Sequence, residues 1–193
     1  MSYAEKFLKA HGQNCTIKRT PIVVSKVSIK RSTKSTRDLG SREAYWEGLI
    51  LLDVSLASGE VITIGSDDYL VQSTNFDPAS GVTAFFAAKS NAALTHKRLI
   101  ETLDTSNNVS VSWSAVNVSV TAYGEIVTYQ LRQFDPGLLE QTRYIFQVPK
   151  FISAVAIEDR IVYNNKNYMV VSIDDTALQG VVRLQLGIDV RPD

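Results

Sequence analysis

The chain has 193 residues, enough for one large domain or two small ones, and 45% of them are hydrophobic, which argues against a disordered chain. Lys plus Arg and Asp plus Glu each number 20, so the net charge does not indicate a nucleic-acid-binding protein, although a local basic patch is compatible with it. The single cysteine, Cys15, excludes an intramolecular disulfide, and the sequence predicts neither a signal peptide nor a membrane-spanning segment. We therefore expect a soluble protein that is made in a cytoplasm.

Two segments show helical hydrophobic spacing, and most of the remaining chain alternates as strands do. Residues 3–11 predict a short amphipathic helix, and residues 92–103 predict a second one. Strand patterns follow each predicted helix, at residues 15–20, 22–30 and 45–56 in the first half and 109–131 and 142–149 in the second. The two histidines, His11 and His96, fall in the predicted helices, where we expect surface or capping residues rather than metal ligands.

The stretch from residue 158 to 187 repeats a pattern that lies 99 residues earlier in the chain. The matched residues are Tyr45 with Tyr144, Ala57 with Ala156, Ile62 with Ile161, Tyr69 with Tyr168, Val71 with Val170, Ser73 with Ser172, Gly81 with Gly180 and Val82 with Val181. The offset stays constant through two turn-prone connectors, residues 65–68 and 164–167, which are rich in residues that favour tight turns. The repeat indicates an internal duplication, in which each copy ends in a three-stranded antiparallel meander.

The upstream strands bring each half to five or six strands, which suits a small closed barrel or a sandwich without exposed edges. We therefore expect a mainly β protein with two tandem antiparallel units related by duplication, each with a short leading helix. The first unit would be residues 1–91 and the second residues 92–193. Units of this size are expected to pack against each other or against neighbouring molecules.

We find no pattern in the sequence from which a catalytic site, a metal site or a cofactor site could be assembled. The nucleophile elbow, the glycine-rich phosphate loop and the zinc-helix motif are all missing. Cys15 has no basic neighbour in its predicted strand, so we interpret it as a small buried hydrophobic residue. The acidic doublets at 67–68 and 174–175 fall at predicted hairpin tips, and calcium binding would need more ligands. We expect no enzyme and no cofactor.

Residues 26–46 are rich in basic residues, serine and threonine and poor in apolar residues. From residue 30 onward the basic side chains are Lys30, Arg31, Lys34, Arg37 and Arg42. A solvated loop between two strands would have this composition, and so would a loop that contacts phosphate groups or a partner protein. The equivalent segment of the second half, residues 128–144, lacks most of the charge, so any such function would belong to the first unit alone.

The pattern of the repeat resembles a strand–turn–strand motif of small β-barrel proteins in the necks of tailed phages. The matching positions are Asp159, Ile161, Tyr168, Val170 and Val171 in the second copy and Gly59, Glu60, Ile62, Gly65, Tyr69 and Val71 in the first. The family is that of the head-closure or stopper proteins, with the related head–tail joining proteins. Stopper proteins usually contain one barrel, so the duplication is a departure from the family.

The resemblance implies a structural virion protein, synthesised in the host cytoplasm, that forms a homo-oligomeric ring around the DNA channel at the head–tail neck. Its partners would be neck proteins on the portal or adaptor side and on the tail side, with no membrane. The basic residues would contact a partner protein, or they would contact packaged DNA without sequence specificity. The predicted loop tips at 75–80 and 174–179 would reach neighbouring subunits, through Asn75, Asp77, Asp174 and Asp175.

Two alternatives remain open at the level of the sequence. Duplicated barrels also suit a tail-tube, tail-terminator or tail-hub component, in which three doubled subunits replace six single ones. Outside phages, a non-enzymatic double-barrel binding module could hold a peptide, a polysaccharide or a single-stranded nucleic acid on exposed aromatic residues. A ring protein forms discrete oligomers, whereas a binding module stays monomeric and gains thermal stability with its ligand.

Overall fold

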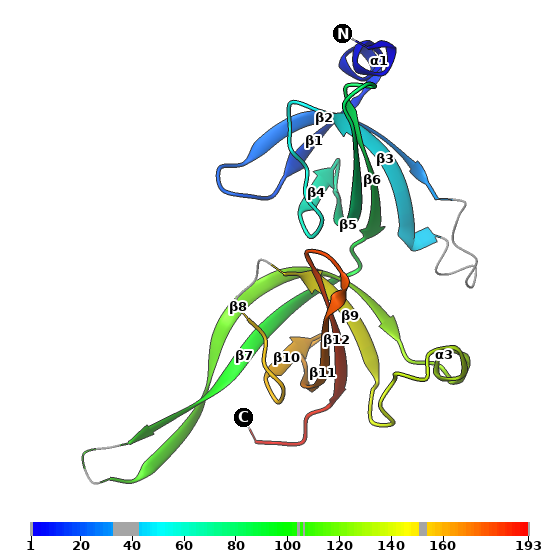
Figure 1. Ribbon diagram of the computed structural model, residues 1–193. Coiled ribbons are helices and arrows are strands. Elements are labelled where there is room, and N and C mark those ends of the chain that lie inside the picture. Colours follow the sequence, from blue (N-terminus) through cyan, green and yellow to red (C-terminus); the bar gives the residue numbers. More distant parts are fainter. Residues whose placement is uncertain (1, 33–42, 104, 106, 151–153, 193) are drawn as a thin grey trace. The chain divides into compact units, whose positions relative to one another are not determined.

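The structure, a computed structural model, describes residues 2–32, 43–103, 105, 107–150 and 154–192 (Figure 1). It forms two closed barrels, each of six antiparallel strands, and so confirms the expected mainly β fold with two tandem units. The chain divides into two compact units, Met1–Ser90 with Thr176–Val181 and Asn91–Asp175 with Val182–Asp193.

The first barrel follows the predicted N-terminal helix. The elements are α1 (Tyr3–His11), β1 (Gln13–Ile17), β2 (Val23–Arg31), β3 (Tyr45–Leu51), β4 (Val61–Ile64), β5 (Asp67–Asp77) and β6 (Val82–Lys89). The hydroxyl of Ser2 accepts a hydrogen bond from the Glu5 amide and caps the helix, and Leu8 is buried against Leu51 and Val82. Leu8, with the partly buried Ala4, thereby fixes the helix to the barrel, as its short amphipathic pattern predicts.

The strands of the first barrel follow the order β1-β2-β3-β6-β5-β4, and β1 pairs with β4 to close it. The closing pairs join Cys15 to Ile64 and Ile17 to Ile62, and all four side chains belong to the core. Cys15 is therefore the small buried residue that its strand position predicts. Burial raises the pKa of its thiol, so the thiol is not activated as a nucleophile.

The second barrel repeats this topology, with the strand order β10-β11-β12-β9-β8-β7. Its elements are β7 (Ala92–Leu103), β8 (Val109–Ile126), α3 (Tyr129–Phe134), β9 (Tyr144–Pro149), β10 (Arg160–Tyr163), β11 (Lys166–Leu178) and β12 (Val181–Ile188). Each strand of the first barrel thus has a counterpart six strands later, and the pairing of β7 with β10 corresponds to that of β1 with β4.

The prediction of a second helix at residues 92–103 is wrong, because these residues form β7. Leu94 and His96 point into the barrel on alternate positions, and β7 pairs with both β8 and β10. Helix-forming Ala, Leu, Lys and Glu account for the error, since β propensity depends on the packing that a strand finds in the sheet. His96 is consequently a buried strand residue, not the surface or capping residue expected of a helix.

The constant offset of the repeat holds through the meanders. The turn residues Gly65 and Asn164 both have positive φ, as do Gly81 and Gly180. Positive φ favours glycine and is tolerated by asparagine, so both copies use the same backbone turn with different residues. The same backbone conformation thus recurs 99 residues later at both turns, where positive φ restricts the residue type. This recurrence supports the internal duplication.

The proposed equivalence of Tyr45 and Tyr144 is wrong by one residue. Tyr144 packs against the core, partly buried, and meets Tyr168 edge-on at 5.2 Å between ring centroids. In the first barrel Trp46, not Tyr45, makes this contact, with Tyr69 at 5.6 Å. A shift of one residue in a strand exchanges its inner and outer faces, so burial identifies the true counterpart where sequence identity does not.

Candidate interaction surface

The structure places only part of the predicted basic segment. Lys30 and Arg31 lie at the end of β2 and not in a loop, whereas Lys34, Arg37 and Arg42 lie outside the described residues. The Arg31 guanidinium pairs with Glu43 at 3.4 Å and stands 5.7 Å from the centroid of the Trp46 ring. Arg31 therefore already has partners within the first barrel.

The four predicted contact residues at loop tips also belong to strands. Asn75 and Asp77 are in β5, and Asp174 and Asp175 are in β11, which continues to Leu178 before the chain turns. The Asp77 carboxylate accepts hydrogen bonds from the turn that follows, chiefly from Ser80, and they lower its pKa. Asp175 forms an exposed ion pair with Lys150 at 3.2 Å. The hairpins are therefore longer than predicted, because β5 continues to Asp77 and β11 to Leu178.

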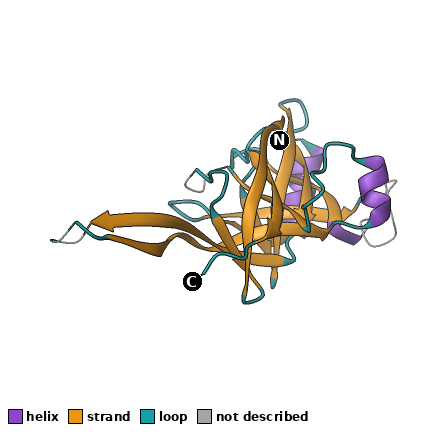
Figure 2. Cartoon of the chain, turned by 90° about the horizontal axis from the view of Figure 1, so that it is seen from below, coloured by secondary structure: helices purple, strands orange, loops and turns teal. Residues whose placement is uncertain are grey.

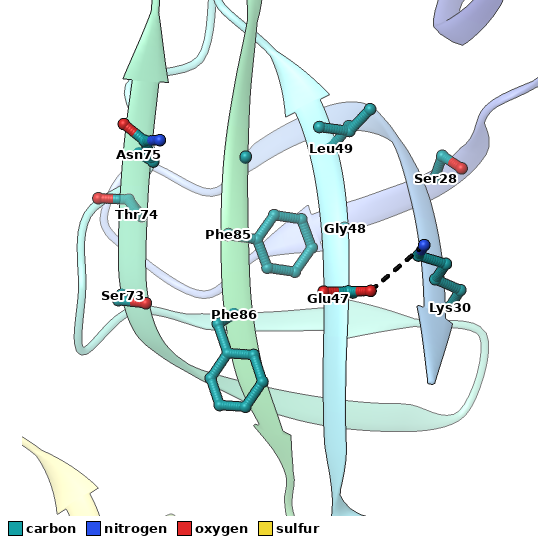
Figure 3. A pocket seen from close by; sticks show the side chains of 11 residues that line it. Ser28, Lys30, Glu47, Gly48, Leu49, Ser73, Thr74, Asn75, Phe85 and Phe86 are labelled. Carbon is teal, nitrogen blue, oxygen red and sulfur yellow. Dashed lines mark ion pairs between the residues drawn. The ribbon is translucent and has the colours of Figure 1, made fainter. Parts of the chain in front are cut away.

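Lys30 and Asn75, predicted separately, line the same groove on the outside of the first barrel (Figure 3). Cross-strand pairing lays two rows of side chains over β2, β3, β6 and β5. The first row is Lys30, Glu47, Phe86 and Ser73, and the second is Ser28, Leu49, Ala84 and Asn75. Neighbours in a row face the same side of the sheet, which here is the side away from the core residues Ile50 and Phe85. We refer to these eight residues as the outer groove.

The outer groove is an open cavity with an ion pair at one end. The cavity has a volume of about 620 Å³. On the core side of β3, a Cβ atom at Gly48 would come within 2.6 Å of the Phe85 ring and 2.7 Å of the Ser28 carbonyl oxygen, so a side chain there would force its neighbours to shift. At one end of the groove, the Lys30 ammonium lies 3.3 Å from the Glu47 carboxylate, and the Lys30 side chain is 77% exposed (Figure 3). Such an exposed pair adds little stability and leaves the lysine able to turn to another acid.

The second barrel covers the equivalent face with its own chain. Gln185, at the position of Phe86 in the repeat, points away from the core and is nevertheless buried. Its side-chain oxygen accepts hydrogen bonds from the Thr142 hydroxyl at 2.8 Å and the Leu139 amide at 3.0 Å, and its amide donates to the Gly137 carbonyl. Residues 135–142 therefore lie over β12, whereas Phe86 and Ala84 of β6 line an open groove.

The longest hairpin projects from the second barrel as a two-stranded ribbon (Figures 1 and 2). Among the described residues, β7 from Arg98 to Leu103 pairs only with β8, over residues 109–114. We call this part, residues 98–103 with 109–114, the arm. One face of the arm carries the cross-strand pairs Leu99–Trp113, Glu101–Val111 and Leu103–Val109. Its aliphatic side chains Leu99, Leu103, Val109 and Val111 are between 40% and 69% exposed.

The base of the arm is fixed by the end of the chain. The Arg160 side chain is fully buried, 3.9 Å from the centroid of the Trp113 ring, and it donates to Asp189 and to the carbonyls of Arg191 and Pro192. Burial alone would raise the pKa of Asp189, but hydrogen bonds from Arg191 and Arg160 outweigh it and lower the pKa to about 2. The ionised Asp189 thus compensates the buried guanidinium.

A second buried cluster surrounds His96, close to the point where the arm leaves the barrel. The ring Nε2 lies 2.8 Å from Asp159, and Nδ1 lies 2.9 Å from the amide nitrogen of Asn117. Arg98 and the Ala156 amide also donate to the Asp159 carboxylate, and these bonds together with His96 lower its pKa despite the opposing effect of burial. Both ring nitrogens are engaged within the protein, so His96 has a structural role in this arrangement.

The first barrel has a carboxylate of its own at the position equivalent to Asp159. Glu60, the counterpart of Asp159 in the repeat, accepts from the Ala57 amide at 2.9 Å and pairs with Arg19 at 3.0 Å. In each barrel an acid therefore caps the turn before the fourth strand and binds an arginine close to the first strand. The sequence pairing of Glu60 with Asp159 pointed to this feature, but the arginines lie far outside the matched stretch.

The described residues contain no group of three or more histidine, cysteine or acidic side chains that could hold a metal ion. In that same part of the chain, no helix is long and apolar enough to cross a membrane. No known protein family matches the sequence, and no curated protein is significantly similar to it.

Sequence reasoning missed the arm, although β8 carries a signal for it. From Val109 to Tyr123 the strand contains no charged residue, no glycine and no proline. A long strand without such interruptions is suited to pairing or docking, and natural edge strands usually avoid this composition. The pattern could not show which part of the strand stays outside the barrel, because that depends on where β9 and β10 end.

Proposed function

We propose that the chain is a non-enzymatic structural subunit of a tailed-bacteriophage virion, which joins copies of itself into a ring around the DNA channel at the head–tail junction. It would be synthesised in the host cytoplasm and would meet neck proteins on the portal or adaptor side and on the tail side. Lys30 and Arg31 would lie near partners or packaged DNA, where positive charge attracts phosphate without sequence specificity.

The observation that carries this proposal is the arm. A two-stranded ribbon that projects alone is only marginally stable in water, and contiguous exposed apolar side chains mark interaction sites. Leu103 and Val109, paired at the far end of the described ribbon, are 69% and 61% exposed. Such a ribbon gains stability when its apolar face is covered by another molecule, as in an assembled ring.

The barrels support the same proposal. A closed barrel leaves no open edge, so each barrel resists uncontrolled strand pairing while the arm makes the contacts. The resemblance to stopper proteins rests on residues that lie in a strand–turn–strand unit, as in Ile161 of β10 and Tyr168 and Val170 of β11. These residues form the core of the second barrel.

The proposal is tested by measuring the mass of the purified full chain across concentration by light scattering, with negative-stain imaging of large species. We expect discrete oligomers. Replacing Leu103 and Val109 together by serine removes two apolar side chains from each contact, worth about 3 kcal/mol, and so weakens assembly about 100-fold. A chain that is monomeric at every concentration contradicts self-assembly and favours the binding-module alternative.

The matched control lies one residue away on each strand. Thr102 and Ser110 form the neighbouring cross-strand pair and face the opposite side of the arm. Their joint replacement by alanine is expected to leave assembly unchanged, and an equal loss from both double variants would show that the apolar face has no special role. The virion part of the proposal is tested by mass spectrometry of virions purified from cells that carry the gene.

A further inference from the structure

We propose that the arm of one copy docks in the outer groove of another copy's first barrel. This inference deepens the proposed function and rests on its self-assembly. The apolar face of the arm would contact the rows of side chains over β2, β3, β6 and β5. The occupant of the groove is thus a second copy of this chain.

The two copies of the barrel differ in how the outer face of their last strand is covered. In the second barrel the outer face of β12 is covered by residues 135–142, which bury Gln185 and pair Asp135 with Arg183. In the first barrel the same positions are Phe86 and Ala84, which offer no hydrogen-bonding side chain to a covering segment. The fold therefore tolerates a cover on this face, and the substitution by apolar residues favours an apolar one.

The arm and the outer groove match in length. The rows of the groove cross four neighbouring strands, which span about 14 Å at roughly 4.8 Å for each strand spacing. The apolar face of the arm runs from Leu99 to Leu103, about 13 Å at roughly 3.3 Å for each residue. A ribbon laid along the rows would therefore cross the strands of the barrel at a steep angle, as sheets do in orthogonal packing.

The arm and the outer groove also match in polarity and charge. The groove presents Leu49, 38% exposed, together with Phe86 and an exposed cation, Lys30. The face of the arm presents aliphatic side chains with one exposed acid, Glu101, paired across the ribbon with Val111. When the apolar side chains meet, Lys30 can turn from Glu47 toward Glu101. The Lys30–Glu101 pair would set the orientation of the arm in the groove, and the burial of apolar side chains would supply most of the affinity.

The closed barrels limit the alternatives. Every strand of the first barrel is paired on both sides, so the arm cannot join it by adding a strand. It must bind a face of the barrel, and the outer groove is a face with the required length and polarity. Direct stacking of two arms remains a distinct geometry, which the experiment below separates from docking in the groove.

The test uses disulfide trapping between two tagged versions of the full chain. One version carries Val111→Cys in the arm, the other Leu49→Cys at the end of the groove where Lys30 lies, and different tags distinguish them by size. Cys15 does not compete, because it is buried and its thiol pKa is raised. We expect the mixed disulfide to be the main product in assembled material. The control, Ser112→Cys on the opposite face of the arm, is expected to lose this product.

The outcomes separate the inference from the proposed function. Assembly with arm–arm disulfides, or without a mixed disulfide, overturns docking in the groove and leaves self-assembly intact. Absence of any assembly overturns both. A groove thiol in Leu49→Cys that is protected from a soluble reagent even in dilute monomers would show that the groove is filled within one copy, which also overturns the inference.

A charge exchange provides an independent readout. Lys30→Glu is expected to weaken assembly, because it places an acid against Glu101. Adding Glu101→Lys in the same chain is expected to restore assembly, since each contact again joins opposite charges. A merely structural effect of the first substitution would not be rescued by the second, so failure of the rescue counts against the assigned contact.

Discussion

Removal of the Asp189 carboxylate is expected to destabilise the second barrel strongly. Asp189→Asn keeps the size of the side chain but takes away the negative charge that faces Arg160, a guanidinium with no solvent exposure. The carboxylate accepts from Arg160 at 2.8 Å and from the Arg191 side chain at 2.8 and 3.0 Å. The substitution therefore leaves a buried cation without its ionised partner, although the carbonyls of Arg191 and Pro192 and the Trp113 ring still contact it.

The expected magnitude follows from two estimates. The fall of the Asp189 pKa from 3.8 to about 2 corresponds to about 2 kcal/mol of unfolding free energy, at about 1.4 kcal/mol for each tenfold change in proton affinity. Breaking a buried ion pair by removing one partner costs about 3–5 kcal/mol. The second figure is larger because it includes the unpaired charge that stays behind. We expect a loss of about 3 kcal/mol for Asp189→Asn.

The loss of unfolding free energy is measured by urea unfolding, with tryptophan fluorescence as the signal. In a Trp46→Phe background the remaining tryptophan, Trp113, contacts Arg160 and reports on the second barrel. The control is Asp175→Asn, which removes an exposed pair with Lys150 and should cost less than about 1 kcal/mol. If Asp189→Asn costs no more than this control, the buried cluster does not stabilise the barrel and the reasoning fails.

The same cluster predicts the direction of the pH dependence. Because the folded-state pKa of Asp189 lies below its unfolded value of 3.8, its contribution is fully present above pH 3.8 and is lost as the pH falls through about 2. The difference between the wild-type chain and Asp189→Asn should therefore shrink over that interval. A difference that stays constant from neutral pH to pH 2 would show that the charge of Asp189 is not its cause.

Two glycines of the first barrel give further predictions, both measured by urea unfolding with Trp46 fluorescence in a Trp113→Phe background. Gly65 has a φ of +62°, and no atom lies within 4 Å of the position that a Cβ would occupy, so Gly65→Ala tests backbone strain alone and should cost about 1 kcal/mol. Gly65→Asn should cost less, because Asn164 adopts the same conformation in the other copy; equal costs would contradict this. Gly48→Ala should cost about 1–3 kcal/mol through its clashes with the Phe85 ring and the Ser28 carbonyl oxygen, and a neutral result would mean that both can shift.

Much of the fold could be predicted because its signals are local. The alternation of apolar residues and the turn residues at Gly65, Asn164 and Gly180 act over a few positions, and they are sufficient to indicate the repeated meander. Cys15 could be assigned to the core because a small thiol in an alternating strand has few other roles. The duplication gave the arrangement of two units, since the same turns recur at a constant offset.

The candidate site could be predicted only in fragments. Lys30 and Asn75 are 45 positions apart in numbering, and the pairing of β3 and β6 between their strands brings them to one groove. The openness of that groove depends on Ala84 and Phe86 standing where the second barrel has Arg183 and Gln185. No local pattern reveals which of the two copies keeps this face covered.

The sequence by itself determined the β class, the duplication and the buried character of Cys15, because periodicity and turn chemistry act between near neighbours in the chain. Only the tertiary structure decided that residues 92–103 form a strand, since their secondary structure depends on pairing with β8 and β10. It also decided which part of β8 becomes the arm and which acid compensates the buried Arg160. These outcomes depend on contacts between residues far apart in the chain, where burial and strand pairing override the preferences of the individual residues.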